Sequence, residues 1–467
     1  MEENFRIEKD FLGEKKIEKE SYYGIQTLRA SENFDITHTS LSLFPNFIKS
    51  LAKVKKSCAL TNYELGDLND IQRDAIIQAC NEIIDGKFHD QFIVDPIQGG
   101  AGTSTNMNAN EVIANRALEI LQKPRSSYEI IHPNNHINMS QSTNDVYPTA
   151  IKLTLHELIY KLKDSLRYLR DAFDVKAEEF KDVLKMGRTQ LQDAVPMTLG
   201  QEFKTYAVMI DEDIYRLRDA QALLKEVNLG ATAIGTGINT KAAYQRKVIS
   251  NLREVTGVDY ISAGNLIEAT QDTGAFVHIS GILKRVAIKI SKICNDLRLL
   301  SSGPRAGFNE INLPKVQPGS SIMPGKVNPV IPEVVNQVAF EVIGADVTIS
   351  MACEGGQLQL NVFEPLVAYK LFTSINMMRR SFYTLAQKCI KGITANEDVC
   401  MENILNSVTI VTSLNPILGY EKSSALAKEA LATNKRIYDI ILEQELFTKE
   451  ELDELLHPKN MVTNYQK

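Results

Sequence analysis

Apolar residues in the middle of the chain recur at alternating spacings of three and four, which is the pattern of the buried face of an α-helix. Three such stripes occupy residues 151–173, 203–227 and 279–300. Runs of the same kind begin at Glu333 and at Pro365, after a proline-rich loop. The sequence therefore predicts a bundle of about five long helices.

On either side of this region the apolar runs are shorter and more charged. No alternating pattern of convincing length predicts a strand among the long helices, although RIEKDFLG near the N-terminus is compatible with a short hairpin. We expect an all-α protein in which a central domain of long helices is flanked by two smaller, mainly helical domains. The expected domains are 1–140, 141–397 and 398–467.

Composition and charge narrow the function classes. Lys and Arg number 52 against 58 Asp and Glu, which gives a net charge of −6, and there is no Trp. The chain thus lacks the basic patches and stacking platforms of a nucleic-acid-binding protein. The charged N-terminus holds no apolar run of a signal or membrane anchor, and the six cysteines form no C-x-x-C pair. We expect a cytoplasmic protein with a small-molecule ligand and neither nucleic acid nor membrane as partner.

Four polar segments stand out because they are rich in hydroxyl and amide groups. They are GGAGTSTNMN (99–108), SQSTND (140–145), GRTQLQDA (187–194) and GSSIMPGKVNP (319–329). Taken singly, each has an ordinary explanation as a helix N-cap or a flexible connector. In the last one, glycine and proline hinges surround a single cation, Lys326. Together the segments predict a pocket for a small carboxylate ligand, because carboxylates accept several hydrogen bonds and attract an ammonium group.

The segment GSSIMPGKVNP resembles the signature loop of the fumarase/aspartase superfamily. The other three segments are similar to the superfamily's remaining substrate-binding segments and occur in the same order. The resemblance extends from YGIQTLRASENF (23–34) to the tail LHPKNM, which ends at Met461. It implies a homotetramer of long-helix bundles, each active site being composed of residues from three subunits, that eliminates ammonia, water or an amine and releases fumarate.

Two features are more similar to the ammonia-lyase branch than to the class II fumarate hydratases. Gln190 stands where the hydratases typically carry His, and VNPVIPEVVNQV follows the signature loop. YGIQTLR, with Leu28, points the same way. The resemblance implies elimination of ammonia from L-aspartate to give fumarate. A fumarate hydratase acting on malate, or a non-catalytic helical structural protein like the superfamily's lens relatives, stays an alternative.

The resemblance also assigns roles to individual residues. It makes Ser320 the base that removes the Cβ proton, by way of an enediolate intermediate, and Glu333 a supporting residue. The expected substrate-binding residues are Thr103, Ser142, Thr143, Asn144, Thr189, Gln190, Ser321, Lys326 and Asn328. An unassisted serine hydroxyl is a very weak acid. We therefore expect Lys326 and the backbone N–H groups of the loop to favour its ionised form.

A metal site would have to rest on the few histidines. His132 and His136 are four residues apart, the spacing of a metal-binding pair on a helix, but Pro133 argues against a helix there. We expect no bound metal and no required cofactor, and activation by divalent cations stays open. HPNNH also resembles a stretch near a secondary anion site of the superfamily, with Asn135 in place of the usual Asp, so the function of that second site stays open.

Overall fold

The computed structural model describes residues 4–456, so the predicted resemblance at 457–461 lies outside the described residues. The chain forms two compact units. Unit 1 comprises 1–163, 215–285 and 341–377, and unit 2 comprises 164–214, 286–340 and 378–467. The units group segments that are distant in the sequence, so they do not test the predicted division into three consecutive domains, which stays a prediction.

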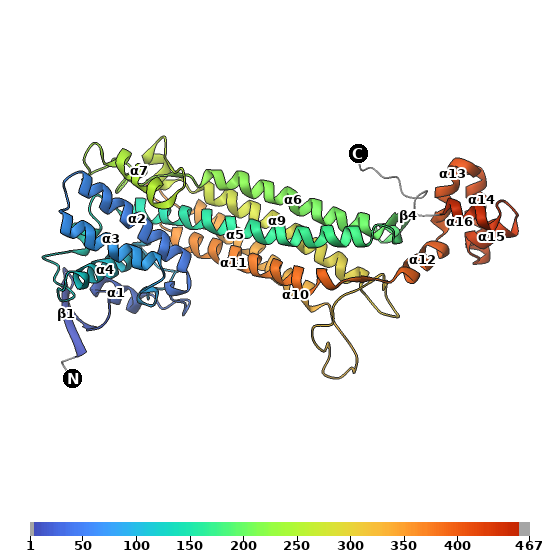
Figure 1. Ribbon diagram of the computed structural model, residues 1–467, viewed down its shortest axis with the longest axis horizontal. Coiled ribbons are helices and arrows are strands. Elements are labelled where there is room, and N and C mark those ends of the chain that lie inside the picture. Colours follow the sequence, from blue (N-terminus) through green and yellow to red (C-terminus); the bar gives the residue numbers. More distant parts are fainter. Residues whose placement is uncertain (1–3, 457–467) are drawn as a thin grey trace. The chain divides into compact units, whose positions relative to one another are not determined.

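The predicted long helices are confirmed, and the fold is all-α apart from small two-stranded sheets. The five helices are α5 (Thr143–Glu179), α6 (Leu199–Leu223), α9 (Gly274–Leu300), α10 (Val330–Glu354) and α11 (Glu364–Lys388) (Figure 1). Each change of unit along the chain falls inside one of them. α6 ends earlier than the apolar stripe predicts, since Val227 belongs to the short strand β5 (Glu226–Val227).

Helix α5 begins at Thr143, ahead of Pro148, which lies inside its second turn. A proline there cannot donate a hydrogen bond to the carbonyl four residues earlier. The side chain of Asn228 replaces the missing donor, because its Nδ2 lies 3.0 Å from the Asn144 carbonyl oxygen. The polar segment at 140–145 therefore continues into the helix without a break.

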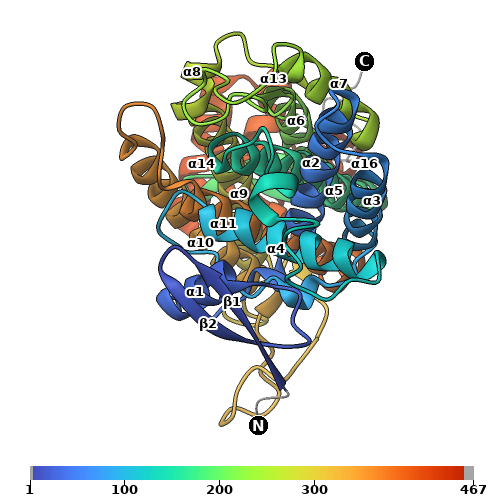
Figure 2. The ribbon, with the colours of Figure 1, turned by 90° about the vertical axis from the view of Figure 1, so that its left-hand side faces the viewer.

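Unit 1 is built around α1 (Ile25–Asn33), α2 (Pro45–Glu64), α3 (Asp70–Ile84), α4 (Thr103–Ile120), α7 (Tyr244–Thr256) and α8 (Leu266–Gln271). Figure 2 shows the hairpin described next beside α1, with α4 close by. The Phe47 ring of α2 packs against Tyr147 of α5 at 5.4 Å and against Phe372 of α11 at 5.2 Å. These aromatic contacts fix the start of α5, and with it the segment 140–145, against the other helices of unit 1.

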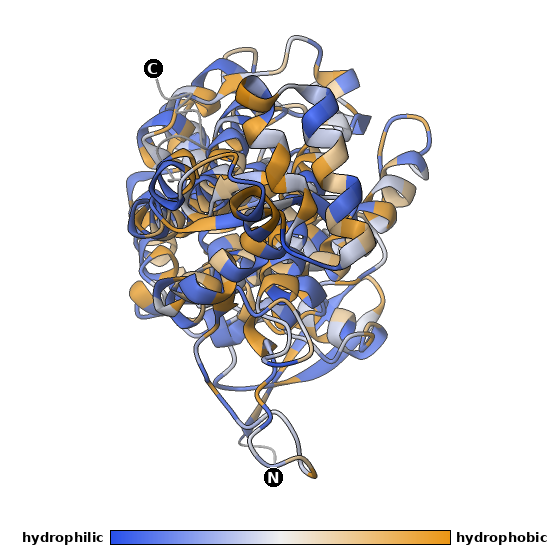
Figure 3. Ribbon diagram, turned by 90° about the vertical axis from the view of Figure 1, so that its right-hand side faces the viewer, coloured by the Kyte–Doolittle hydropathy of each residue, from blue (hydrophilic) through white to orange (hydrophobic). Residues whose placement is uncertain are grey.

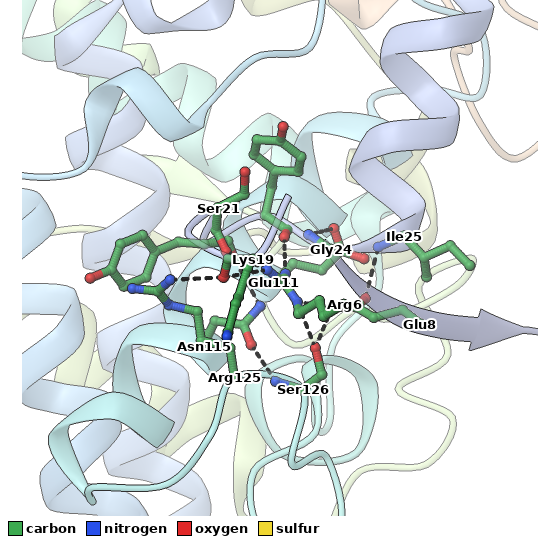
Figure 4. A network of polar contacts seen from close by, with 12 residues as sticks. Arg6, Glu8, Lys19, Ser21, Gly24, Ile25, Glu111, Asn115, Arg125 and Ser126 are labelled. Carbon is green, nitrogen blue, oxygen red and sulfur yellow. Dashed lines mark hydrogen bonds and ion pairs between the residues drawn. The ribbon is translucent and has the colours of Figure 1, made fainter. Parts of the chain in front are cut away.

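The predicted N-terminal hairpin is confirmed as β1 (Phe5–Asp10) paired with β2 (Gly13–Glu18). Two buried carboxylates hold the chain that follows it (Figure 4). Glu111 of α4 accepts hydrogen bonds from the backbone N–H groups of Gly24 and Thr27, and Glu8 accepts one from Ile25. Burial raises the pKa of Glu111 to about 7, and the neighbouring charge of Glu8 raises it as well.

Unit 2 contains a hairpin that the sequence pattern does not predict, formed by β3 (Leu184–Thr189) and β4 (Gln192–Thr198). The segment GRTQLQDA lies in this hairpin and not in a loop, so the expectation that no strand interrupts the long helices is wrong. The usual alternation is hidden because Lys185 is buried together with its apolar neighbours Leu184 and Met186. Burial of a lysine is tolerated here because it pairs with Glu202 and Glu310.

Five short helices complete unit 2: α12 (Glu397–Asn406), α13 (Val411–Leu418), α14 (Tyr420–Thr433), α15 (Ile437–Glu443) and α16 (Lys449–Leu455). Figure 3 shows hydrophobic and hydrophilic residues interspersed along them, as in helices with one buried face. Their core includes Ile404, Leu414, Leu426 and Ile440, and Met186 of β3 joins it. The base of the β3–β4 hairpin is thus part of a hydrophobic core.

The remaining strands and turns are short. β5 pairs in parallel with β6 (Ile261–Ser262), and β7 (Ile311–Asn312) pairs with β8 (Thr394–Ala395) in antiparallel fashion. The 3₁₀ turns are Leu41–Leu43, His89–Gln91, Ile390–Gly392 and Val408–Ile410, and Pro133–Ile137 forms a π-helical turn.

Helix α10 has an unusual surface. Phe340, Val347 and Met351 are 62%, 58% and 69% exposed, at spacings of seven and four. Within residues 4–456, α10 alone is long and apolar enough to cross a membrane by length and composition, a test that core helices of other proteins also pass. Its polar residues are tied to α9, since Asn336 donates to Ser291 and Asp346 accepts from Ser280. The apolar face of α10 is therefore a candidate for contact with another chain.

Glu364 begins α11 inside unit 1 and is only 4% exposed. Burial raises the pKa of its carboxyl group to about 8, although the charge of Lys152 lowers it. Lys152 itself donates to the Glu226 carbonyl oxygen at 2.8 Å. Glu364 thus favours its protonated form in the folded chain.

This raised pKa predicts a pH-dependent stability. Above the ordinary pKa of 4.5 the unfolded chain releases the proton that the folded chain keeps up to about pH 8. The stabilising effect of the proton is complete below pH 4.5 and is lost as the pH rises towards 8, by at most about 1.4 kcal/mol per pH unit. In urea denaturation, Glu364→Gln should therefore flatten the fall of the unfolding free energy across this window. The exposed Glu354→Gln should keep the wild-type slope, and equal slopes in wild type and Glu364→Gln would contradict the prediction.

Candidate active site

The predicted base, Ser320, lies in the loop between β7 and α10. The loop closes on itself, because the Gly319 N–H donates to the Lys326 carbonyl oxygen at 2.8 Å and Asn328 Nδ2 donates to the Gly319 carbonyl oxygen at 2.6 Å. A Cβ on Gly319 would lie 2.7 Å from the Lys326 oxygen, so only glycine fits there. Asn328 therefore shapes the loop, in addition to any contact with substrate.

The hydroxyl oxygen of Ser320 accepts two backbone hydrogen bonds, from the N–H groups of Ile322 at 3.2 Å and Met323 at 3.0 Å. Backbone donors aimed at an oxygen stabilise negative charge on it without any rearrangement. The loop therefore favours the ionised form of Ser320, as a base requires. Ser320 is half-buried, so the residue remains partly accessible to solvent.

The other predicted residues around this loop remain accessible. Ser321 and Lys326 are exposed, and Glu333 lies half-buried in the first turn of α10. Within residues 4–456 the Lys326 ammonium group forms neither an ion pair nor a hydrogen bond, so it is available to a ligand carboxylate.

Thr189 and Gln190 lie at the tip of the β3–β4 hairpin, and both are exposed. Thr189 pairs with Gln192, so Gln190 and Leu191 form a two-residue turn. Their φ angles are +55° and +62°, as in a type I′ turn, where Asn and Gly are the favoured residues. Gln190 is thus exposed at the turn, in a backbone conformation with positive φ that neither Gln nor Leu favours.

In unit 1, Thr103 is the first residue of α4 and is exposed. Its hydroxyl donates to the Gly100 carbonyl oxygen at 2.8 Å. The preceding Gly102 has a φ of +90°, and a Cβ there would lie 2.5 Å from a ring carbon of Tyr147. Thr103 is thus set against the start of α5 by a close contact that needs glycine.

The segment 140–145 supplies three further predicted residues. Ser142 Oγ accepts from the Asn144 N–H at 3.2 Å, and Asn144 Nδ2 donates to the Ala233 carbonyl oxygen at 2.7 Å. Thr143 is buried, and its hydroxyl oxygen accepts from Asn106. Ser142 and Asn144 can still contact a ligand, being half-buried, whereas Thr143 belongs to the polar interior.

Sequence reasoning misses the buried charged groups that support this segment, one of them being its own last residue. Asp145 accepts hydrogen bonds from the backbone N–H groups of Ser142, Gly230 and Thr232, and burial raises its pKa to about 6. Lys55 of α2 is 1% exposed and donates to Asn138 and Gln141, and burial lowers its pKa to about 8.

A signal for Lys55 exists in the sequence. It shares a helical face with Leu51 and Cys58, where a lysine is unexpected.

The structure therefore places the predicted residues in two groups. Unit 1 holds Thr103, Ser142, Thr143 and Asn144, and unit 2 holds Thr189, Gln190, Ser320, Ser321, Lys326, Asn328 and Glu333. Each group consists mainly of neutral hydrogen-bond donors, and unit 2 adds one cation and one activated hydroxyl. Hydroxyl, amide and ammonium groups of this kind suit a carboxylate ligand, and the activated hydroxyl suits removal of a neighbouring proton.

The histidine segment forms a π-helical turn over Pro133–Ile137, so the expectation of a non-helical segment is wrong. Proline fits at the first position of the turn, and His132 Nδ1 caps it by accepting from the Asn134 N–H. His136 Nδ1 accepts from the His132 N–H. Both Nδ1 atoms are thus occupied, and burial lowers the pKa of both rings. Within residues 4–456 no cluster of three or more metal-binding side chains occurs.

Comparison with known proteins agrees with the resemblance predicted from the sequence. The family model described as "Lyase" matches residues 13–344, and that described as "Fumarase C C-terminus" matches residues 410–463. The chain belongs to the fumarase/aspartase superfamily.

Superfamily members in several bacteria are similar to it over nearly their whole length. An aspartate ammonia-lyase of Helicobacter pylori is 61% identical over 98% of both chains. That of Escherichia coli is 51% identical, over 99% of this chain and 97% of the relative.

Solved structures of the superfamily agree with the fold. A fumarate lyase:delta crystallin from Brucella melitensis bound to cobalt matches with a TM-score of 0.95 and 52% identity, covering 97% of this chain and 98% of that chain. A class II fumarase from Schistosoma mansoni matches with a TM-score of 0.91 and 35% identity over the same shares. The superfamily fold predicted from the polar segments is confirmed.

Proposed function

We propose that this chain is an aspartate ammonia-lyase, a carbon–nitrogen lyase that reversibly eliminates ammonia from L-aspartate to give fumarate. The observation that carries the proposal is the identity of 51% to 61% with relatives of that name over nearly the whole length. Gln190, which is exposed at a hairpin tip and stands where the hydratases typically carry His, also supports the proposal.

The elimination begins with removal of a proton from Cβ of the substrate. Ser320 is the base, its oxygen being stabilised by the N–H groups of Ile322 and Met323. The charge left on Cβ spreads into the adjacent carboxylate as an enediolate, which fixed hydroxyl, amide and ammonium donors stabilise as it forms. Lys326 supplies the one cation. Because the mechanism uses only groups of the chain, we propose that no cofactor is required.

The leaving group favours aspartate over malate. An ammonium group departs as ammonia without a strong acid, and the Gln190 amide oxygen can accept a hydrogen bond from it. A hydroxyl group leaves as water only with a proton donor, and the amide at position 190 is not one of useful strength. Glu333 lies near the start of α10, but this chain has Gln190 in place of the histidine that the hydratases typically carry.

An absorbance assay of fumarate formation tests the assignment. Purified protein should form fumarate from L-aspartate and consume fumarate when ammonium is present. L-malate should be turned over at least about 100-fold more slowly, because the site offers no acid for the departing hydroxyl. Turnover of malate alone would identify a fumarate hydratase instead.

Replacing the proposed base distinguishes an enzyme from a non-catalytic structural protein. We expect Ser320→Ala to lower kcat by about 1,000-fold, since general-base catalysis contributes on this order. Its melting temperature should stay close to that of the wild type, because the side chain lies in an open loop. Ser301→Ala, which removes a hydroxyl at the end of α9, is the matched control and should keep full activity. An unchanged rate in Ser320→Ala would rule out the proposed base.

We also propose a homotetramer in the cytoplasm, with composite active sites. The exposed apolar residues of α10 support association, because a face of this kind is rare on a chain that acts alone. The cysteines support the location: within residues 4–456 all are free and only Cys353 is not buried.

Light scattering and activity measured on the same samples test the assembly. The wild type should have four times the mass of the chain, and Phe340→Glu should give smaller, inactive species because it places a charge on the apolar face of α10. Leu431→Glu, at an exposed leucine of α14, should change neither mass nor rate. A fully active wild-type monomer would contradict composite sites.

A further inference from the structure

The arginine of the segment GRTQ does not face solvent at the hairpin tip. Its Nη1 donates to Glu310 Oε1 at 2.5 Å and to the Met186 carbonyl oxygen at 3.4 Å, and its guanidinium lies 4.3 Å from the ring centre of Phe308. An arginine beside residues that bind a dicarboxylate would be the natural partner of that ligand. The Nη1 group of Arg188 is instead bound within the chain.

Glu310 is the group that engages it, and its side chain is completely buried. While one oxygen binds Arg188, the other lies 3.1 Å from Nζ of Lys185, which also pairs with Glu202. Both cations lie on β3. A buried carboxylate is costly unless it is paired, so Glu310 and β3 hold each other in place.

The backbone of Glu310 is fixed as well. Its carbonyl oxygen accepts from the Asn396 N–H at 2.9 Å, next to the paired strands β7 and β8. The loop that carries Ser320 follows β7. Glu310 therefore ties the strand leading to Gln190 to the strand leading to Ser320.

The hairpin tip needs such an anchor because its turn is strained. Gln190 and Leu191 both have positive φ, which non-glycine residues adopt only when the surrounding structure imposes it. On the opposite strand, Asp193 is held by the Ser407 hydroxyl at 2.8 Å. Leu191 is 63% exposed, so its own side chain contributes little to holding the turn. The flanks of the turn, and not its residues, fix its shape.

We propose that Glu310 is a positioning residue, which acts through Arg188 to hold the strained turn and so present Thr189 and Gln190 to substrate. The inference rests on the proposed function for its effect on catalysis, whereas its effect on the hairpin is independent of that function. Arg188 thereby acts as part of the scaffold of the hairpin.

Hydrogen exchange and kinetics of Glu310→Gln test this. Backbone amides of 186–194 should exchange at least about 10-fold faster than in the wild type, while those of the short helices α13 to α16 stay unchanged. The KM for L-aspartate should rise and kcat/KM should fall by about 100-fold, the cost of a displacement of about 1 Å in a site. Glu402→Gln, which removes an exposed carboxylate paired with Arg436, is the control and should change neither quantity.

Two further variants keep the test decisive. Arg188→Met leaves Glu310 its pair with Lys185, so it is expected to fold even if Glu310→Gln does not, and it should loosen the same amides. Adding Leu191→Gly to either variant should restore part of the order and of KM, because glycine adopts positive φ without strain. A merely stabilising role for Glu310 predicts no such rescue.

Specific outcomes overturn the proposal. Unchanged exchange at 186–194 in both variants would show that the pair does not hold the hairpin. Increased exchange with an unchanged KM would show that the hairpin does not position substrate-binding residues. If the wild type does not convert L-aspartate, the proposed function fails, and the exchange measurements still decide whether Glu310 anchors the turn.

Discussion

A solvent-accessible polar segment keeps a fixed shape only if buried groups bind its backbone or its flanking strands. The structure depends on this constraint. The four polar segments are short and rich in glycine or hydroxyl groups, and most of the predicted site residues in them are half-buried or exposed. A buried carboxylate supports two of them: Asp145 accepts hydrogen bonds from three backbone N–H groups at the start of α5, and Glu310 pairs with two cations of β3. Each carboxylate is costly to bury, and each is kept because it fixes a backbone that has little else to hold it.

The same arrangement explains how a mildly acidic chain suits a dianionic ligand. The charges that organise the site are buried and already neutralised within the chain, as in the pairing of Arg188 with Glu310. The groups left for the ligand are hydroxyls, amides and the ammonium of Lys326. In the proposed mechanism, neutral donors that are already in place require no reorganisation as negative charge moves from Cβ into a carboxylate. Net charge is therefore a poor guide to what this protein binds.

The long helices could be predicted from the sequence because their stripes are long and regular, as between Ile151 and Phe173. The β3–β4 hairpin could not, because the partners that make Lys185 buriable are distant in the sequence and the alternation disappears. The segments carrying the candidate site were recognisable as motifs. Their supports were harder to recognise. Glu310 looks like an ordinary surface charge until the fold places it inside, and Lys55 is marked only by its place on the helical face of Leu51 and Cys58.

The proline in α5 has a consequence for the order in which the molecule is assembled. Asn228, which completes the hydrogen bonding of the first turns, lies 84 residues beyond the carbonyl that it satisfies. The N-terminal end of α5 thus cannot reach its final stability while only its own sequence has folded. During synthesis the rest of this helix can form early, but the end that carries Ser142 and Asn144 matures only after a later part of the chain has emerged and docked. The hydrogen bonding at the start of α5 is therefore completed by Asn228, a residue distant in the sequence.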